Sequence, residues 1–168
     1  MSETAVPPAA ATALRTYVEV SGTSGAIGSI NSGLALGNTT NTSVTVNLGL
    51  TDLNGNSVGS TSVAVPAGGQ VARFLNEIFP NVSVPFKGVL HVTASSLIAL
   101  AALRGRYNER GDFLMSTTPP AIEALPAATT PLIFPHIVNG GGFRTQFILF
   151  SGAANQIANG DLHLTYEN

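Results

Sequence analysis

Apolar and polar residues alternate along most of the chain with a period of two, which is the pattern of a β-strand with one buried face. The alternation is plain from Ser57 to Val65 and from Phe113 to Thr117, and Asn54-Gly55 is a turn pair typical of β-hairpins. The same pattern predicts strands at Thr16–Val20, Leu34–Leu36, Val44–Leu50, Gly88–Ala94, Leu97–Tyr107, Arg144–Phe150 and Asp161–Tyr166. Short strands with frequent turns between them predict an antiparallel β-sandwich.

One segment has the period of a helix instead. After Gly68-Gly69 the apolar residues are spaced three and four apart, and Pro80 ends the pattern. This spacing predicts one short amphipathic helix, at about residues 69–79, that packs on the sheet. Its buried side is predicted to consist of Val71, Phe74, Leu75, Ile78 and Phe79, with Phe74 and Leu75 at the centre.

Composition divides the chain into four parts. Residues 1–15 are rich in alanine and proline and predict an extended N-terminal arm. Residues 16–118 hold most of the predicted strands and form the β-sandwich. Residues 119–133, rich in proline, alanine and threonine, predict a linker, and residues 134–168 predict a partial second sandwich that completes or pairs with another one.

An internal match connects the two strand-rich parts. Leu34–Asn54 falls without a gap on Ile148–Asn168, which predicts a repeated strand pair. The first copy continues into the return strand Ser57–Val65, whereas nothing follows the second copy in this sequence. The strand Asp161–Tyr166 is therefore predicted to have an open edge, which is a template for pairing with another chain. The candidate assembly residues are Leu162, Leu164 and Tyr166, together with Leu14 in the N-terminal arm.

Composition narrows the possible functions. Hydrophobic residues make up 44% of the chain and charged residues only 10%, so serine, threonine and asparagine provide most of the polar surface. This balance excludes intrinsic disorder and a coiled coil. Seven Lys and Arg against nine Asp and Glu give no basic face for a nucleic acid. The longest apolar run, Leu97–Leu103, is too short to cross a bilayer.

Motifs for catalysis or metal binding are lacking in the sequence. There is no cysteine, no phosphate loop and no Gly-x-Ser-x-Gly elbow, so we expect no catalytic residues, no cofactor and no enzymatic activity. Gly140–Gly142 precedes a predicted strand and is interpreted as a tight turn. Asp52, Asn54 and Asn56 alternate as in a calcium loop, but a hairpin turn explains them equally well. We expect no metal site, because the histidines are far apart in sequence: His91, His136 and His163.

Five of the sixteen charged residues lie between positions 104 and 112. One interpretation is a network at a sheet corner, in which arginines pair with Glu109 and Asp112. The other is a ligand site, and the network is favoured. The candidate binding residues of this cluster are Arg104, Arg106, Asn108, Arg110 and Asp112.

Several longer stretches resemble a β-repeat that occurs in tandem near the C-termini of large secreted proteins of environmental bacteria, Acidobacteria-like ones especially. The resemblance covers nearly the whole chain and implies an immunoglobulin-like, extracellular, non-catalytic module. It assigns no functional residues. The matching stretches are Tyr17–Gly22, Gly33–Leu36 with Asn38, Pro66–Leu75, Leu103–Phe113, and Phe134–Ile137 with Gly140–Gly142.

Together these observations predict a structural or adhesive module, outside the cell or at its surface, that associates with itself through its terminal strands. Donor-strand complementation between neighbouring copies would produce a fibre or filament. No signal peptide is expected within residues 1–15, which have no basic or long apolar region. The alternative is a carbohydrate-binding β-sandwich with a glycan as its partner. The absence of tryptophan and the scattered tyrosines disfavour that alternative.

Overall fold

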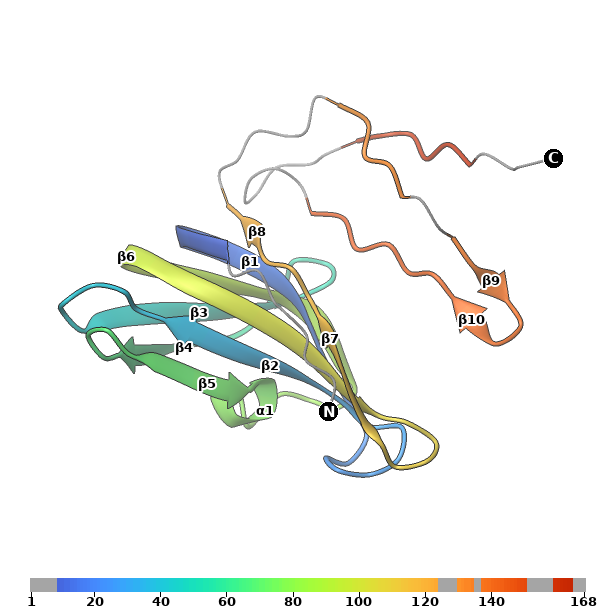
Figure 1. The fold of residues 1–168 in the computed structure, drawn as a ribbon, viewed down its shortest axis with the longest axis horizontal. Coiled ribbons are helices and arrows are strands. Elements are labelled where there is room, and N and C mark those ends of the chain that lie inside the picture. The colour runs from blue at the N-terminus through green and yellow to red at the C-terminus, as the bar shows by residue number, and fades with distance from the viewer. Residues whose placement is uncertain (1–8, 124–129, 135–136, 151–158, 165–168) are drawn as a thin grey trace. The chain divides into compact units, whose positions relative to one another are not determined.

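The computed structural model of the chain (Figure 1) describes residues 9–123, 130–134, 137–150 and 159–164. The chain divides into two compact units, Met1–Ile122 and Glu123–Asn168. The boundary falls inside the predicted linker 119–133.

The first unit is built almost entirely of strands. In chain order its elements are β1 (Ala9–Ser21), β2 (Ile30–Gly37), β3 (Val44–Asp52), β4 (Ser57–Val65), β5 (Gln70–Phe74), α1 (Leu75–Ile78), β6 (Phe86–Tyr107), β7 (Phe113–Thr117) and β8 (Ala121–Ile122). The second unit contains β9 (Asn139–Gly140) and β10 (Phe143–Arg144) in its described residues.

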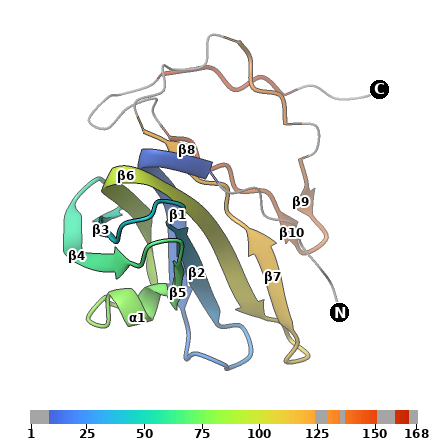
Figure 2. The same ribbon diagram turned by 60° about the vertical axis from the view of Figure 1, so that its left-hand side comes forward.

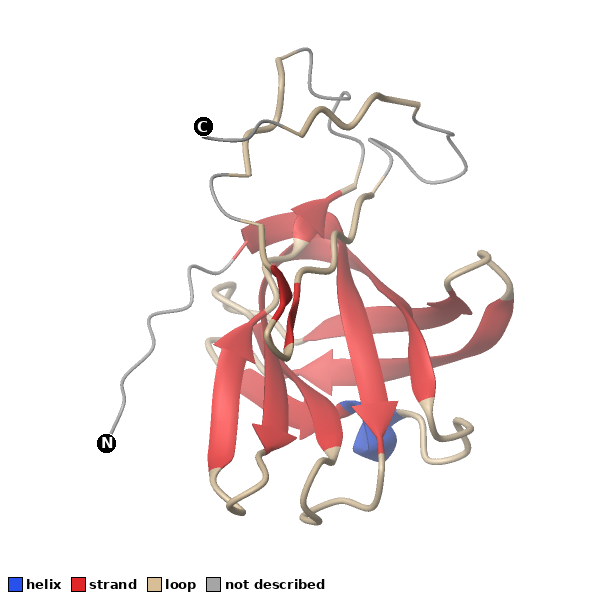
Figure 3. Ribbon diagram, turned by 90° about the vertical axis from the view of Figure 1, so that its right-hand side faces the viewer, coloured by secondary structure: helices blue, strands red, loops and turns tan. Residues whose placement is uncertain are grey.

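All strands of the first unit belong to one antiparallel sheet with the order β4-β3-β6-β1-β2-β5. Strand β7 also pairs with β6, β8 pairs with β1, and β2 pairs with both β1 and β6. Because of these double pairings the sheet curls into a half-barrel, as Figures 2 and 3 show. The predicted all-β, antiparallel class is confirmed, but a curled sheet takes the place of the two separate layers of a sandwich.

Strand β6 is responsible for much of the curl. The sequence predicts two strands here, but the structure has one strand of 22 residues. Its first half pairs with β3 at Gly88–Ala94, and its second half pairs with β2 at Ala99–Arg106. Its register against β1 shifts between Ala11 and Ala13, so one continuous strand bends through both halves of the sheet.

The hydrophobic core lies on the inner side of the curl. Strand β3 shows the predicted alternation, with Val44, Val46, Leu48 and Leu50 buried and threonine or asparagine between them in its first half. The other buried core residues come from β1, β2, β4, β6 and the segment around α1: Leu14, Val18, Val20, Leu34, Leu36, Val65, Leu75, Phe79, Phe86, Leu90, Val92, Ile98, Leu100 and Ala102.

The prediction of a free N-terminal arm is wrong for the part that the structure describes. Strand β1 begins at Ala9, and Leu14 is fully buried between Val92 of β6 and Ile122 of β8. Its burial means that Leu14 is a core residue rather than an assembly residue. Residues 1–8 lie outside the described part of the chain.

The predicted helix at 69–79 is also mostly wrong. Residues 70–74 form β5, which pairs with β2, and only Leu75–Ile78 is helical. Phe74 lies opposite Gly33 on the outer face and is 42% exposed, whereas Leu75 is fully buried. Pairing with β2 satisfies the backbone of this segment better than a single exposed helix turn would, so tertiary context overrides the helical spacing.

Asn38 connects the loop that follows β2 to the turn between β4 and β5. Its buried amide donates hydrogen bonds to the carbonyls of Thr42, Val65 and Pro66 at 2.8, 3.1 and 3.0 Å. Its side-chain oxygen accepts the Thr40 N–H at 2.9 Å. These bonds fix the point from which β4 and β5 separate.

The second unit contains fewer strands than predicted. The glycine run 140–142 forms a turn as expected, with Gly141 and Gly142 at positive φ between β9 and β10. Residues 145–150 and 159–164 are not strands, so the predicted strands Arg144–Phe150 and Asp161–Tyr166 are wrong over these residues. The match to Leu34–Asn54 therefore does not extend to structure there, since an apolar segment needs a partner to become a stable strand. Tyr166 lies outside the described residues.

Candidate functional site

The two edges of the curled sheet, β4 and β5, face one groove. Within the described residues β4 pairs with β3 alone, and β5 pairs with β2 alone. An edge strand presents N–H and C=O groups that another strand can bind. The sequence positions these edges as neighbours, because only residues 66–69 separate β4 from β5.

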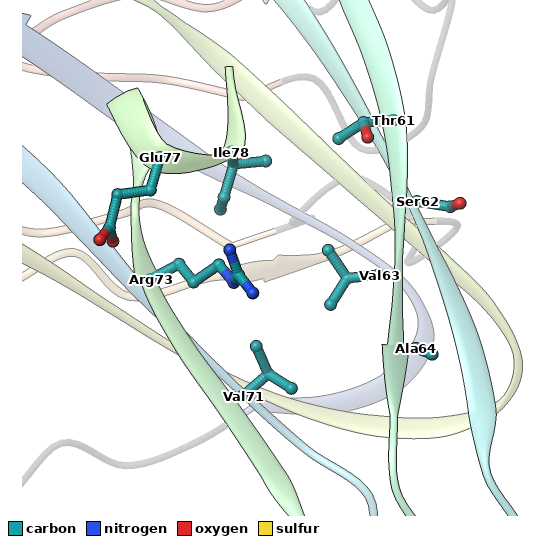
Figure 4. Close-up of a pocket in the computed structure, with 8 residues that line it drawn as sticks. All are labelled: Thr61, Ser62, Val63, Ala64, Val71, Arg73, Glu77 and Ile78. Carbon is teal, nitrogen blue, oxygen red and sulfur yellow. The ribbon is translucent and has the colours of Figure 1, made fainter. Parts of the chain in front are cut away.

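The groove between them has a volume of about 330 Å³ and an apolar floor. Figure 4 shows β4 and β5 diverging, with Val63 on one side and Val71 and Ile78 on the other. These three side chains are half-buried and pack against the core. Its remaining lining residues are Thr61, Ser62, Ala64, Arg73 and Glu77.

Arg73 and Glu77 give the groove its charge. Figure 4 shows the Arg73 guanidinium extending into the groove between β5 and β4. No hydrogen bond or ion pair joins Arg73 to another residue in the described parts of the chain. The Glu77 carboxylate accepts the Phe74 N–H at 2.6 Å, at the start of α1. Arg73 is therefore the charge in the groove that is available to a partner.

The sequence analysis missed this site because it placed residues 70–74 in a helix. A signal was present, since Val71 and Arg73 alternate with Gln70, Ala72 and Phe74 as in a strand. The helical spacing of Phe74, Leu75 and Ile78 obscured it. An edge strand also cannot be recognised until its pairing partners are known.

The predicted binding cluster does not converge on one place. Arg104 bonds through Nε to the Glu19 carboxylate at 3.0 Å, and Lys87 lies 3.6 Å from the same carboxylate. Glu19 is nearly buried, so this pair closes one part of the sheet. The predicted partners of the arginines, Glu109 and Asp112, are not those of Arg104.

The rest of the cluster forms the turn between β6 and β7. Asn108 accepts the backbone N–H groups of Arg110 and Asp112 at 2.9 and 2.8 Å, and its amide donates to the Asp112 carboxylate at 3.0 Å. Arg106 pairs with Glu109, and Arg110 pairs with Asp112 at 3.1 Å. The favoured interpretation, a charged network at a corner, describes these residues better than a ligand site.

Tyr17 lies beside Glu19 with its hydroxyl buried. Burial raises the pKa of Tyr17 above its ordinary value of 10.0, and the negative charge of Glu19 raises it further. The hydroxyl makes no hydrogen bond among the described residues. The folded protein therefore resists ionisation of this group.

Above about pH 10 the unfolded chain ionises Tyr17 while the folded chain does not, so part of the free energy of unfolding is lost as the pH rises. Below that pH this contribution is fully present. Tyr17→Phe should leave stability at pH 7 unchanged or slightly higher, and should make stability less sensitive to pH between 9 and 11. Urea denaturation of both proteins at pH 7, 9 and 11 checks this. Equal alkaline losses would contradict it.

Asp52 shows how the calcium-like pattern is used. Its carboxylate accepts the N–H groups of Asn54 and Asn56 at 2.9 and 2.8 Å, and the Asn56 amide at 2.9 Å. The bonds from Asn56, first its side chain and then its backbone, lower the pKa of Asp52. A hairpin turn with Gly55 at positive φ accounts for all three residues.

The histidines and acidic residues do not assemble into a metal site in the described parts of the chain, where no three ligand side chains come together. His91 lies on the outer face of β6 with its Nε2 3.3 Å from Thr51 Oγ1. His136 lies outside the described residues. No helix in the described ranges is long and apolar enough to span a membrane.

The C-terminal assembly candidates have a different environment from Leu14. Leu162 and Leu164 are 64% and 54% exposed, and neither is part of a strand. Large apolar side chains with this exposure mark a surface that another molecule can cover.

A second, shallower hollow of about 620 Å³ lies on the outer face of β4, β3 and β6. Its lining is polar and contains hydroxyl, amide and imidazole groups. They belong to Asn47, Ser60, Thr61, Ser62, His91 and Thr93, with Leu48 and Gly49 between them.

Comparison with known proteins shows a likeness in fold alone. No family model matches the chain, and no curated protein matches it. The crystal structure of Thermotoga maritima 1070 is similar, with a TM-score of 0.53 and 11% sequence identity. The similarity covers 65% of this chain and 93% of that one.

Proposed function

We propose that the chain is a non-enzymatic structural or adhesive module, outside the cell or at its surface, that associates with other copies by strand addition. The observation that carries the proposal is the pair of open edges, β4 and β5, beside one apolar groove. A strand from a partner would bond to an edge backbone and place alternate side chains in the groove.

The composition of β4 supports its role as the accepting edge. Proteins ordinarily protect exposed edges with charged residues, proline or bulges. The nine residues Ser57–Val65 contain no charge and no proline, only small polar and apolar side chains. Strand β4 is therefore long, uncharged and available along its outer side.

The extracellular setting rests on the sequence. A surface dominated by serine, threonine and asparagine, with 10% charged residues, is compatible with it. The resemblance to tandem repeats of large secreted bacterial proteins supports the same setting. Labelling of intact cells with an antibody, compared with lysed cells, tests the localisation directly.

The association is tested by a charge placed in the groove. Thr61→Lys adds a cation at an exposed position of β4 that lines the groove, next to the cation of Arg73. Thr45→Lys is the matched control, because Thr45 is exposed on the outer side of β3. By analytical ultracentrifugation, we expect wild type and Thr45→Lys to associate with increasing concentration, and Thr61→Lys to associate at least about tenfold more weakly.

Circular dichroism would establish that both variants fold. A wild-type protein that stays monomeric at every concentration overturns the proposal. So does a folded Thr61→Lys variant that associates as the wild type does.

The second candidate function is carbohydrate binding, and the polar hollow favours it. Hydroxyl, amide and imidazole groups are suitable hydrogen-bond partners for a sugar. No aromatic ring lines that hollow, so it lacks a stacking platform. Binding to a glycan array that is lost in Asn47→Ala, by a protein that remains monomeric, would favour this function over strand addition.

A further inference from the structure

We propose that the strand entering the groove is the Asp161–Leu164 segment of a second copy of this chain, laid along β4. The proposal rests on the proposed function, because it names the partner that the two open edges accept. It concerns a contact between two molecules.

The segment has the pattern of a strand with one buried face, but no partner. Residues 159–164 do not belong to any strand, and both leucines are more than half exposed. In an extended chain Leu162 and Leu164 point to the same side, whereas Asp161 and His163 point to the other. Such a segment buries its leucines only by pairing with another sheet.

A second apolar segment, residues 147–150, is less suitable as a donor. It reads Phe-Ile-Leu-Phe and has apolar side chains on both sides of an extended chain. Added to an edge at the surface, it would leave half of these side chains in water. The alternation of Asp161–Leu164 avoids this cost, because only the leucines enter the groove.

Spacing and charge in the groove match the segment. Thr61 and Val63 are two residues apart on one side of β4, as Leu162 and Leu164 are in the donor. Arg73 is the Lys or Arg residue among the groove-lining residues, and it has no ion-pair partner in the described parts of the chain. Asp161 is the charged residue of 159–164 and supplies the opposite charge.

The geometry has a consequence for the assembly. Donor and acceptor are different surfaces, one in each compact unit, so the contact is heterologous. Contacts of this kind produce open chains when the rotation between copies does not close a ring.

Disulfide trapping tests the contact, since the chain contains no cysteine. One protein would carry Ser62→Cys in β4 and the other His163→Cys, both on the side that faces away from the groove. Mixed under oxidising conditions, they should form a disulfide-linked dimer at least about tenfold faster than Ser62→Cys with the control Gln146→Cys. Gln146 is exposed and belongs to the less suitable segment.

Leucine replacement gives an independent test by ultracentrifugation. Leu162→Asp with Leu164→Asp should weaken association at least about tenfold, whereas Leu132→Asp, at an equally exposed leucine of the same unit, should not. Arg73→Asp should weaken association as well, and Asp161→Arg added to it should restore part of the loss.

The outcomes separate the two proposals. If Thr61→Lys blocks association but the leucine variants and the trapping do not differ from their controls, another strand occupies the groove and this inference is overturned. A disulfide that forms within single molecules carrying both cysteines, at monomer mass, overturns it too. If the wild type never associates, both proposals are wrong.

Discussion

Leu75→Ala is expected to lower the free energy of unfolding by about 2–5 kcal/mol, because Leu75 is fully buried in the core beside the start of β5. Phe74→Ala, one residue earlier, is expected to cost roughly 1 kcal/mol. The Phe74 ring lies on the outer face against Gly33, where its Cε1 would be 3.5 Å from a Cβ added to that glycine. Urea denaturation of the two variants measures the difference.

The pair decides between a strand and a helix for residues 70–74. A helix over 69–79 would bury both side chains, and the two losses would then be similar. A Phe74→Ala loss of about 3 kcal/mol or more would contradict the observed edge strand, and with it the groove.

Gly88→Ala is expected to destabilise the fold by about 3 kcal/mol or more. A methyl group at position 88 would overlap the carbonyl oxygen of Thr51 in β3 and the ring of Phe86. The carbonyl belongs to a paired strand, so relief requires β3 and β6 to move apart. Thermal and urea unfolding, with expression level as a second measure, would report the loss.

Gly105→Ala is the matched control on the same strand. An added methyl group there meets the ring of Phe113, an exposed side chain on β7 that can turn away, and no backbone atom closer than 3.6 Å. We expect a loss of about 1 kcal/mol. Equal losses in the two variants would show that crowding of the backbone is not what requires glycine at position 88.

Local patterns predicted the elements that depend on local chemistry. Ser57–Val65 and Phe113–Thr117 were predicted with the bounds they have, and the Asn54-Gly55 turn was predicted with them. Alternation in β3 correctly identified its buried side. In each case the residues that decide the structure are close together in sequence.

Features that depend on distant partners were not predicted. Glu19 and Arg104 meet across 85 positions, and neither neighbourhood indicates the other. Residues 70–74 fit both a helix and a strand until β2 is known to lie beside them. The break predicted near Ser95-Ser96 is a change of register within one strand, because β1 and β2 continue to pair across it.

The length of β6 also determines the order in which this chain can fold as it leaves the ribosome. Hairpin β3–β4 needs only residues 44–65, so it can form early. Strands β1, β2 and β3 all pair with β6, which is complete only at Tyr107. Until then β1 can pair with β2 only at its end, and most of its apolar residues have no sheet to join. This dependence on late, non-local pairing makes folding slow, and it leaves β1 exposed to aggregation or to chaperones throughout the synthesis of the first unit.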